Sequence, residues 1–179
     1  MAELEIAVLD ATGAERDDLV AAFRAGTLDA EELPRFRFRL GSDATWRPHP
    51  QVAFLTLPIE PAVPVDGPPL VWQQRVTGSP CGLLEVWHRF TWGTKDASAL
   101  GRHPAPTVTS TIAYELVLRV MEGAFGPLAA ADRGAEVEGE LAAMQQLVAV
   151  FARPEFVAAA RAAVGPLGPA LRAIAPRPG

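Results

Sequence analysis

Two stretches of alternating apolar and polar residues between positions 70 and 92 constrain the fold most. They read LVWQQRV and LLEVWHRFTW, and they flank TGSPCG, a segment rich in glycine, proline and serine. Alternation with a period of two is typical of strands that bury one face, and a short turn segment between two such strands predicts an antiparallel hairpin. The apolar face of this hairpin needs a covering layer.

The charges on the two strands favour one register. In this register Arg75 lies opposite Glu85 and Trp72 lies opposite His88, whereas a slip by one residue would separate the ion pair. One face then carries Trp72, Gln74, Val76, Leu84, Val86, His88, Phe90 and Trp92. The other carries Val71, Gln73, Arg75, Leu83, Glu85, Trp87, Arg89 and Thr91. We expect the face with His88 to be the buried one.

The segments before the hairpin predict further strands and one helix. Alternating apolar residues predict strands at 4–9 and 35–40, and the nearly continuous apolar run at 51–59 predicts a strand buried on both faces. A helix with an apolar stripe is expected after the first strand, ending at Gly26. Residues 93–106, after the hairpin, are expected to form a long loop.

The character of the sequence changes near residue 107, after which helical spacing dominates. Helices are expected at 110–122, 135–152 and 154–164, with a short one at 169–175. Grouped strands followed by grouped helices predict an α+β fold. The prediction is an antiparallel sheet of about five strands in the N-terminal part, packed against one N-terminal helix and three to four C-terminal helices.

The domain organisation follows from the apolar character of the helix at 110–122. Only a narrow polar stripe interrupts its apolar circumference, so this helix needs the sheet to cover it. A boundary near residue 106 is therefore less favoured than one α+β domain over 1–179, strand-rich at 1–106 and helical at 107–175.

Composition and charge narrow the classes of function. The chain has 179 residues and a net charge of −5, which disfavours binding to nucleic acid or to an anionic membrane surface. The acidic N-terminus is unlike a signal peptide, no apolar run is long enough for a membrane helix, and Cys81 is the single cysteine. We expect a cytoplasmic protein, and the bias toward alanine, arginine, glycine and proline indicates a bacterial source.

The arginines of two strands give the first hypothesis of function. If the strand at 35–40 lies beside the hairpin, a basic face with one tryptophan forms on an acidic protein. This face consists of Arg35, Arg37, Arg39, Arg75, Trp87 and Arg89. It predicts a non-catalytic interaction or adaptor protein that binds an acidic partner surface or an anionic small molecule, and homo-oligomers are compatible with it. The alternative for the arginines is a solvated edge strand.

The other face of the hairpin gives the second hypothesis. There a cavity under the helices would have Trp72, His88, Phe90 and Trp92 as its wall and His88 as its polar group. The protein would then be a small-molecule-binding protein or a small enzyme. The more ordinary interpretation is a partly buried histidine bonded to a backbone carbonyl, with Glu85 as an ion-pair residue on the wet face.

The remaining reactive side chains predict neither a metal site nor a cofactor. His49, His88 and His103, with Asp96, could form a metal site only if two loops met the strand, and their spacing matches no ligand pattern. Cys81 lies in a turn without a base near it in sequence. Because no motif names a reaction, the sequence leaves open whether the protein is an enzyme.

Overall fold

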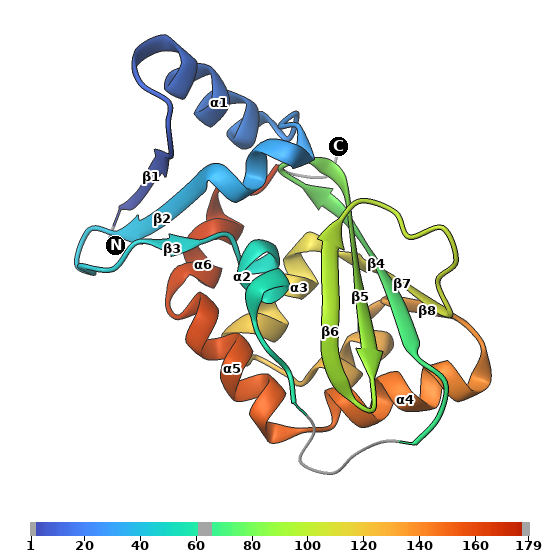
Figure 1. Ribbon diagram of the computed structural model, residues 1–179. Coiled ribbons are helices and arrows are strands. Elements are labelled where there is room, and N and C mark those ends of the chain that lie inside the picture. Colours follow the sequence, from blue (N-terminus) through green and yellow to red (C-terminus); the bar gives the residue numbers. More distant parts are fainter. Residues whose placement is uncertain (1–2, 61–65, 177–179) are drawn as a thin grey trace.

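The protein has an α+β fold, as its sequence predicts (Figure 1). The computed structural model describes residues 3–60 and 66–176. The strands are β1 (Leu4–Val8), β2 (Phe36–Leu40), β3 (Arg47–Pro48), β4 (Leu70–Ser79), β5 (Gly82–Thr91), β6 (Thr94–Leu100), β7 (Val108–Ala113) and β8 (Glu136–Gly139). The α-helices are α1 (Gly13–Ala25), α2 (Pro50–Thr56), α3 (Tyr114–Glu122), α4 (Leu141–Phe151), α5 (Pro154–Val164) and α6 (Leu167–Ala173). Two short 3₁₀ helices are η1 (Ala30–Arg35) and η2 (Pro127–Arg133).

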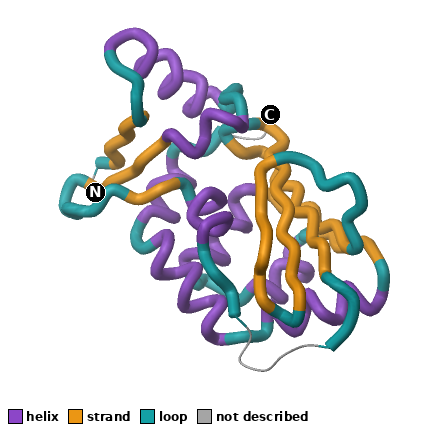
Figure 2. Tube along the Cα trace, in the orientation of Figure 1, coloured by secondary structure: helices purple, strands orange, loops and turns teal. Residues whose placement is uncertain are grey.

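The strands form two sheets rather than one, and Figure 2 shows them as two separate groups. The smaller sheet has the order β1-β2-β3 and is antiparallel, whereas the larger one has the order β6-β5-β4-β7-β8. In the larger sheet β4 and β7 run parallel, so this sheet is mixed. The single antiparallel sheet predicted from the sequence is therefore corrected in its strand grouping, while the fold class is confirmed.

The predicted hairpin is formed by β4 and β5, in the predicted register. Arg75 lies opposite Glu85, and Trp72 lies opposite His88. The face with His88 is indeed the buried one, since His88 is fully buried and Trp72 nearly so. We call this face of the larger sheet the inner face and the opposite one the outer face.

The parallel pairing of β7 with β4 requires a crossover between β6 and β7. Because β6 lies at one edge of the larger sheet and β7 beyond β4, residues 101–107 cross over the outer face (Figure 1). Gln73 anchors this crossover. Its Nε2 donates to the carbonyls of Val86 and Gly101, both at 3.1 Å, and its Oε1 accepts from the His103 N–H at 2.7 Å.

The segment predicted as a strand at 51–59 forms helix α2 instead. Pro50 occupies the first turn of the helix, and Nδ1 of the N-cap residue His49 accepts the Gln51 N–H. The residues of α2 from Pro50 to Phe54 are all buried. A short segment that is apolar on every side has no periodicity that separates helix from strand.

The loop predicted at 93–106 begins with a strand, β6. Trp92 and Gly93 form the turn between β5 and β6, and both have positive φ, 55° and 77°. Two left-handed residues in a row are typical of a tight hairpin turn, usually Asn-Gly or Asp-Gly. A tryptophan in the first of these positions is unusual, so no turn is indicated by the sequence here.

Two helices begin later than the sequence predicts, because a strand precedes each of them. Residues 108–113 form β7, in agreement with their content of Val, Thr and Ile, and α3 starts at Tyr114. Residues 136–139 form the edge strand β8 beside β7, and α4 starts at Leu141. The helix at 154–164 is confirmed as α5, and the first helix ends at Gly26, which has a φ of 75°.

Helices α3 and α4 pack on the larger sheet, while α6 packs on α3 and on the smaller sheet (Figure 1). One continuous apolar core includes Phe36 and Phe38 of the smaller sheet, Val76 and Leu84 of the larger one, and Leu118 of α3. None of the helices in the described residues is long and apolar enough to cross a membrane.

Candidate functional site

A cavity of about 440 Å³ lies between the inner face of the larger sheet and the helices that cover it. Trp72 of β4 and Ile112 of β7 line it from the sheet. Val117 of α3, Met144 of α4 and Phe156 of α5 line it from the helices. The helices that cover the inner face of the sheet do not fill the space beneath them, and this leaves the cavity.

The lining of the cavity is almost entirely apolar. Leu, Val, Ile, Met, Phe, Ala and Pro supply most of it, and none of the lining residues in the described part of the chain is charged or titratable. Its polar side chains are Trp72, Gln74 and Ser110. The Trp72 indole Nε1–H donates to Ser110 Oγ at 2.7 Å, so the indole polar group is already satisfied.

Gln74, one of the lining residues, carries a buried polar atom that lacks a partner in the described residues. The residue is only 8% exposed, and within the described part of the chain its Oε1 is buried without a hydrogen-bond partner. A buried carbonyl oxygen without a donor costs about 1–3 kcal/mol of stability. A buried polar atom of this kind is a candidate for a hydrogen bond to a bound molecule.

The cavity reaches the surface at one side. Leu128 of η2, Val137 of β8 and Val148 of α4 all line it, and they are 42%, 43% and 49% exposed. Leu141, at the start of α4, is 68% exposed and follows β8 closely in the chain. Large apolar side chains that are exposed together at the edge of a cavity provide a path for an apolar molecule to enter.

The aromatic wall that the sequence predicts around His88 is only partly present. Of its four members Trp72 lines the cavity, whereas His88 and Phe90 are buried beside it and Trp92 is 58% exposed in the turn after β5. Ring contacts separate His88 from the space: its centroid lies 4.7 Å from that of Phe54 and 5.0 Å from that of Trp72.

His88 is held as a neutral imidazole. Its Nδ1 lies 2.8 Å from the Ser98 hydroxyl oxygen, and its Nε2 is buried with no partner in the described residues. Burial, together with the charge of Lys95, lowers the pKa of His88 to about 3. At neutral pH this group is therefore uncharged and lies behind two rings, and its hydrogen-bond partner is a serine hydroxyl rather than the backbone carbonyl of the ordinary interpretation.

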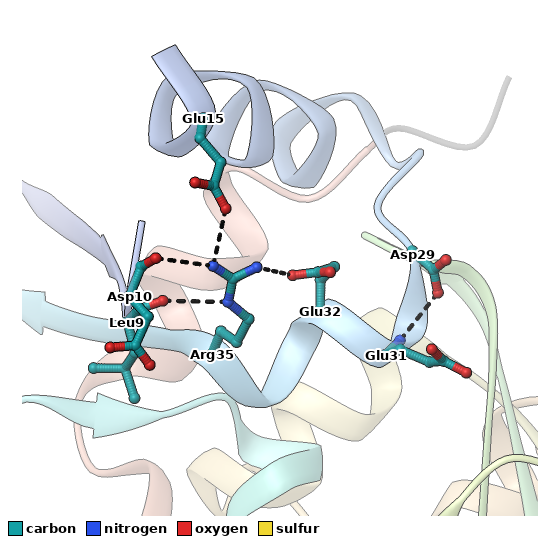
Figure 3. Close-up of polar contacts among 7 residues, drawn as sticks. All are labelled: Leu9, Asp10, Glu15, Asp29, Glu31, Glu32 and Arg35. Atoms are coloured by element: carbon teal, nitrogen blue, oxygen red, sulfur yellow. Dashed lines mark hydrogen bonds and ion pairs between the residues drawn. The ribbon is translucent and has the colours of Figure 1, made fainter. Parts of the chain in front are cut away.

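The basic face predicted from the arginines does not assemble. β2 belongs to the smaller sheet, so its arginines are not beside the hairpin. Figure 3 shows the Arg35 guanidinium between Glu15, at 3.1 Å, and Glu32, with two backbone carbonyls completing its contacts. Arg39 pairs with Glu5 and stacks over Trp46 at 4.6 Å.

The other members of that predicted face are also paired or covered. Arg37 donates to the carbonyls of Pro34 and Phe36. On the outer face of the hairpin, Arg75 pairs with Glu85 at 3.3 Å and Arg89 pairs with Asp96 at 3.0 Å. Trp87 is half-buried, because the crossover places the His103 ring 4.9 Å from its own.

The three histidines lie in separate environments. His49 bonds to the Tyr114 hydroxyl at 3.1 Å, His88 to Ser98, and His103 contacts Trp87. Across residues 3–60 and 66–176, no three His, Cys, Asp or Glu side chains are grouped to hold a metal ion. Burial, with the charge of Asp29, raises the pKa of the Cys81 thiol to about 12, so it is not a thiolate at neutral pH.

Two side chains of the cavity were not singled out from the sequence. Gln74 was assigned to the correct face, but nothing in a strand pattern separates a glutamine that lacks a partner from one that has several. Ser110 fell in a segment interpreted as the start of a helix. The register Gln74–Ser110 across β4 and β7 is what brings the two together, and it depends on the parallel pairing.

Comparisons with known proteins give structural likenesses only. No protein-family model matches the sequence, and no curated protein matches it. Among solved structures, sterol carrier protein 2 is 19% identical, with 79% of this chain and 94% of that one covered and a TM-score of 0.42. A conserved hypothetical protein from Thermus thermophilus, described as possibly a sterol carrier protein, is 20% identical over 52% and 68%, with a TM-score of 0.43. A palmitated sterol carrier protein 2-like 2 from Aedes aegypti is 21% identical over 44% and 70%, with a TM-score of 0.35. Because these TM-scores lie below 0.5, function has to be argued from the cavity itself.

Proposed function

We propose that this protein binds an apolar small molecule of the lipid class in the cavity between the larger sheet and helices α3, α4 and α5. The observation that carries the proposal is the cavity of about 440 Å³ with an apolar lining. Pockets for small ligands are typically about 300–1,000 Å³ and mostly apolar, with a few polar groups that fix orientation. The cavity agrees with this description in its size, in its apolar lining and in its few polar side chains.

The energetics of filling an apolar cavity support the same proposal. Protein interiors are close-packed, and side chains that line a void lose contacts on one side. An apolar molecule in the cavity would restore those contacts and would be removed from water itself. The molecule would enter the cavity past the exposed apolar side chains of Leu128, Val137 and Val148.

The lining favours binding over catalysis. A general acid or base has to lie within hydrogen-bond reach of a substrate atom, whereas the lining residues carry no titratable group. His88, the candidate base, is separated from the cavity by Phe54 and Trp72. We therefore propose a binding or carrier protein, and composition alone supports placing it in a bacterial cytoplasm.

Titration with Nile red, an uncharged apolar dye, tests the proposal. We expect saturable binding to the wild type and at least tenfold weaker binding to Ala160→Phe, because Ala160 of α5 lines the cavity and a phenyl ring there would occupy it. Ala158→Phe is the matched control, since Ala158 lies on the same helix, is exposed and does not line the cavity. Equal dye affinity in both variants, each with a wild-type circular dichroism spectrum, would reject the cavity as the binding site.

A further inference from the structure

Two polar side chains of the cavity lie side by side on the sheet. Gln74 of β4 and Ser110 of β7 are register partners on neighbouring strands, which run about 4.8 Å apart in a sheet. Both residues are more than nine-tenths buried, and both line the cavity. They therefore form one polar spot on an otherwise apolar floor.

We propose that the ligand of this cavity carries an uncharged hydroxyl group, which Gln74 and Ser110 bind, and that ligands with a carboxylate are rejected. The inference rests on the proposed function, because it names the chemical class of molecule that the same cavity binds.

The hydrogen-bonding state of Ser110 decides what it can offer a ligand. Its oxygen accepts the Trp72 indole N–H at 2.7 Å, so its own O–H remains as a donor. The Gln74 Oε1 has no donor in the described residues and remains as an acceptor. A hydroxyl group accepts one hydrogen bond and donates another. It can therefore satisfy the Ser110 O–H and the Gln74 oxygen at once, whereas an ether, a ketone or a halide has no hydrogen to donate to that oxygen.

The charge of the lining decides against a carboxylate. Among residues 3–60 and 66–176, no arginine, lysine or histidine lines the cavity, so a buried carboxylate would have none of these cations beside it. An ionised group that is buried without a partner is expelled or takes up a proton instead. Moreover, a carboxylate only accepts hydrogen bonds, and it would leave the Gln74 oxygen without a donor.

Octanol, chlorooctane and octanoate, which have the same chain length, test the proposal. The affinity of each is measured by displacement of Nile red from the wild type. We expect octanol to bind about tenfold more tightly than chlorooctane, the fold-change of roughly one net hydrogen bond. Octanoate is expected to bind at least a hundredfold more weakly than octanol at pH 8. Its affinity should rise about tenfold per pH unit between pH 8 and pH 6, as the uncharged acid becomes more populated, while that of octanol stays constant.

Substitution of Gln74 tests whether the polar spot binds the hydroxyl group. In Gln74→Leu, octanol should lose its advantage over chlorooctane, while chlorooctane affinity is unchanged or higher. Gln145→Leu is the matched control, because Gln145 is exposed on α4 and does not line the cavity. Ser110→Ala, the second variant, should reduce the octanol advantage in the same direction.

The outcomes separate this inference from the proposed function. If all three molecules displace the dye with similar affinity, or if octanoate equals octanol at pH 8, the hydroxyl inference is rejected while the apolar cavity still binds ligands. The same holds if Gln74→Leu keeps the octanol advantage. If none of the three displaces the dye, the proposed function fails and the inference fails with it. The wild-type series decides the question even if a variant does not fold.

Discussion

Gln73 and Gln74 are neighbours on β4, but their side chains lie on opposite faces of the larger sheet and differ in their hydrogen bonding. On the outer face Gln73 makes three hydrogen bonds, two to carbonyls and one to the His103 N–H. On the inner face Gln74 lines the cavity, and its Oε1 has no partner among the described residues. Both side chains are buried, at 2% and 8% exposed.

The comparison separates a structural polar residue from a candidate binding residue. Gln73 satisfies its carboxamide by holding the crossover on the sheet, so its role is complete within the chain. Gln74 has the same chemistry with its oxygen unpaired, and a buried polar group of that kind costs stability. What it lacks is what a ligand would supply.

Replacement of Gln73 should have the largest effect. We expect Gln73→Leu to lower the free energy of unfolding by about 2–4 kcal/mol, because it leaves the Val86 carbonyl and the His103 N–H without their partner. Urea unfolding followed by tryptophan fluorescence measures this. A loss below about 0.5 kcal/mol would contradict the anchoring role of Gln73 in the crossover.

The pH dependence of stability should identify His88 as a neutral residue of the inner face. Its folded-state pKa of about 3 lies below the unfolded value of 6.5, so the unfolded chain binds more protons between these values. Its contribution is fully present above pH 6.5 and is lost as pH falls toward 3, at up to about 1.4 kcal/mol per pH unit.

We expect unfolding experiments between pH 6 and pH 4 to give a shallower slope for His88→Leu than for the wild type, by about 1.4 kcal/mol per pH unit. His49, whose burial also lowers its pKa to about 3, remains in both proteins and contributes to both slopes. Identical slopes would mean that His88 becomes protonated in the folded protein.

Replacement of Gln74 should act in the opposite direction to replacement of Gln73. Gln74→Leu removes a buried oxygen that has no partner in the described residues, so the ligand-free protein is expected to gain about 1 kcal/mol in the free energy of unfolding. Thermal unfolding of protein stripped of bound molecules measures the change. A loss of about 1 kcal/mol or more would indicate that Gln74 has a structural partner after all.

The smallest effect is expected at the ion pair that predicted the hairpin register. Arg75 and Glu85 lie 3.3 Å apart on the outer face, and the arginine side chain is 44% exposed. Exposed cross-strand pairs contribute at most about 1 kcal/mol, so Arg75→Ala should cost about 0.5 kcal/mol or less and fade in high salt. A larger loss, insensitive to salt, would show a role beyond this pair.

The sequence was sufficient for features that depend on local spacing. Alternation and one ion pair predicted the hairpin in its register, and Pro154 with Gly165 bracketed helix α5. It was insufficient where a segment is apolar throughout, as in α2, or where the turn residues are unusual, as at Trp92. Sheet membership and the parallel β4–β7 pairing are long-range choices that no local pattern encodes.

The candidate site shows the same division. The sequence pointed to the inner face and to Trp72, but the polar role was assigned to His88, the one titratable residue on that face of the hairpin. Which side chain borders a cavity depends on where the covering helices leave space. That space is set in part by Phe54 of α2, whose segment was predicted as a strand, so His88 was expected at a surface that Phe54 in fact covers.

Quenching of Trp72 by a brominated octanol tests the central claim most directly, because bromine quenches tryptophan fluorescence on contact and Trp72 lines the cavity. We predict saturable quenching of the wild type that is abolished in Trp72→Phe, in which Trp46, Trp87 and Trp92 remain as emitters. Quenching of equal size in both proteins would place the ligand on the surface, near the exposed Trp46 or Trp92, and would contradict binding in the cavity.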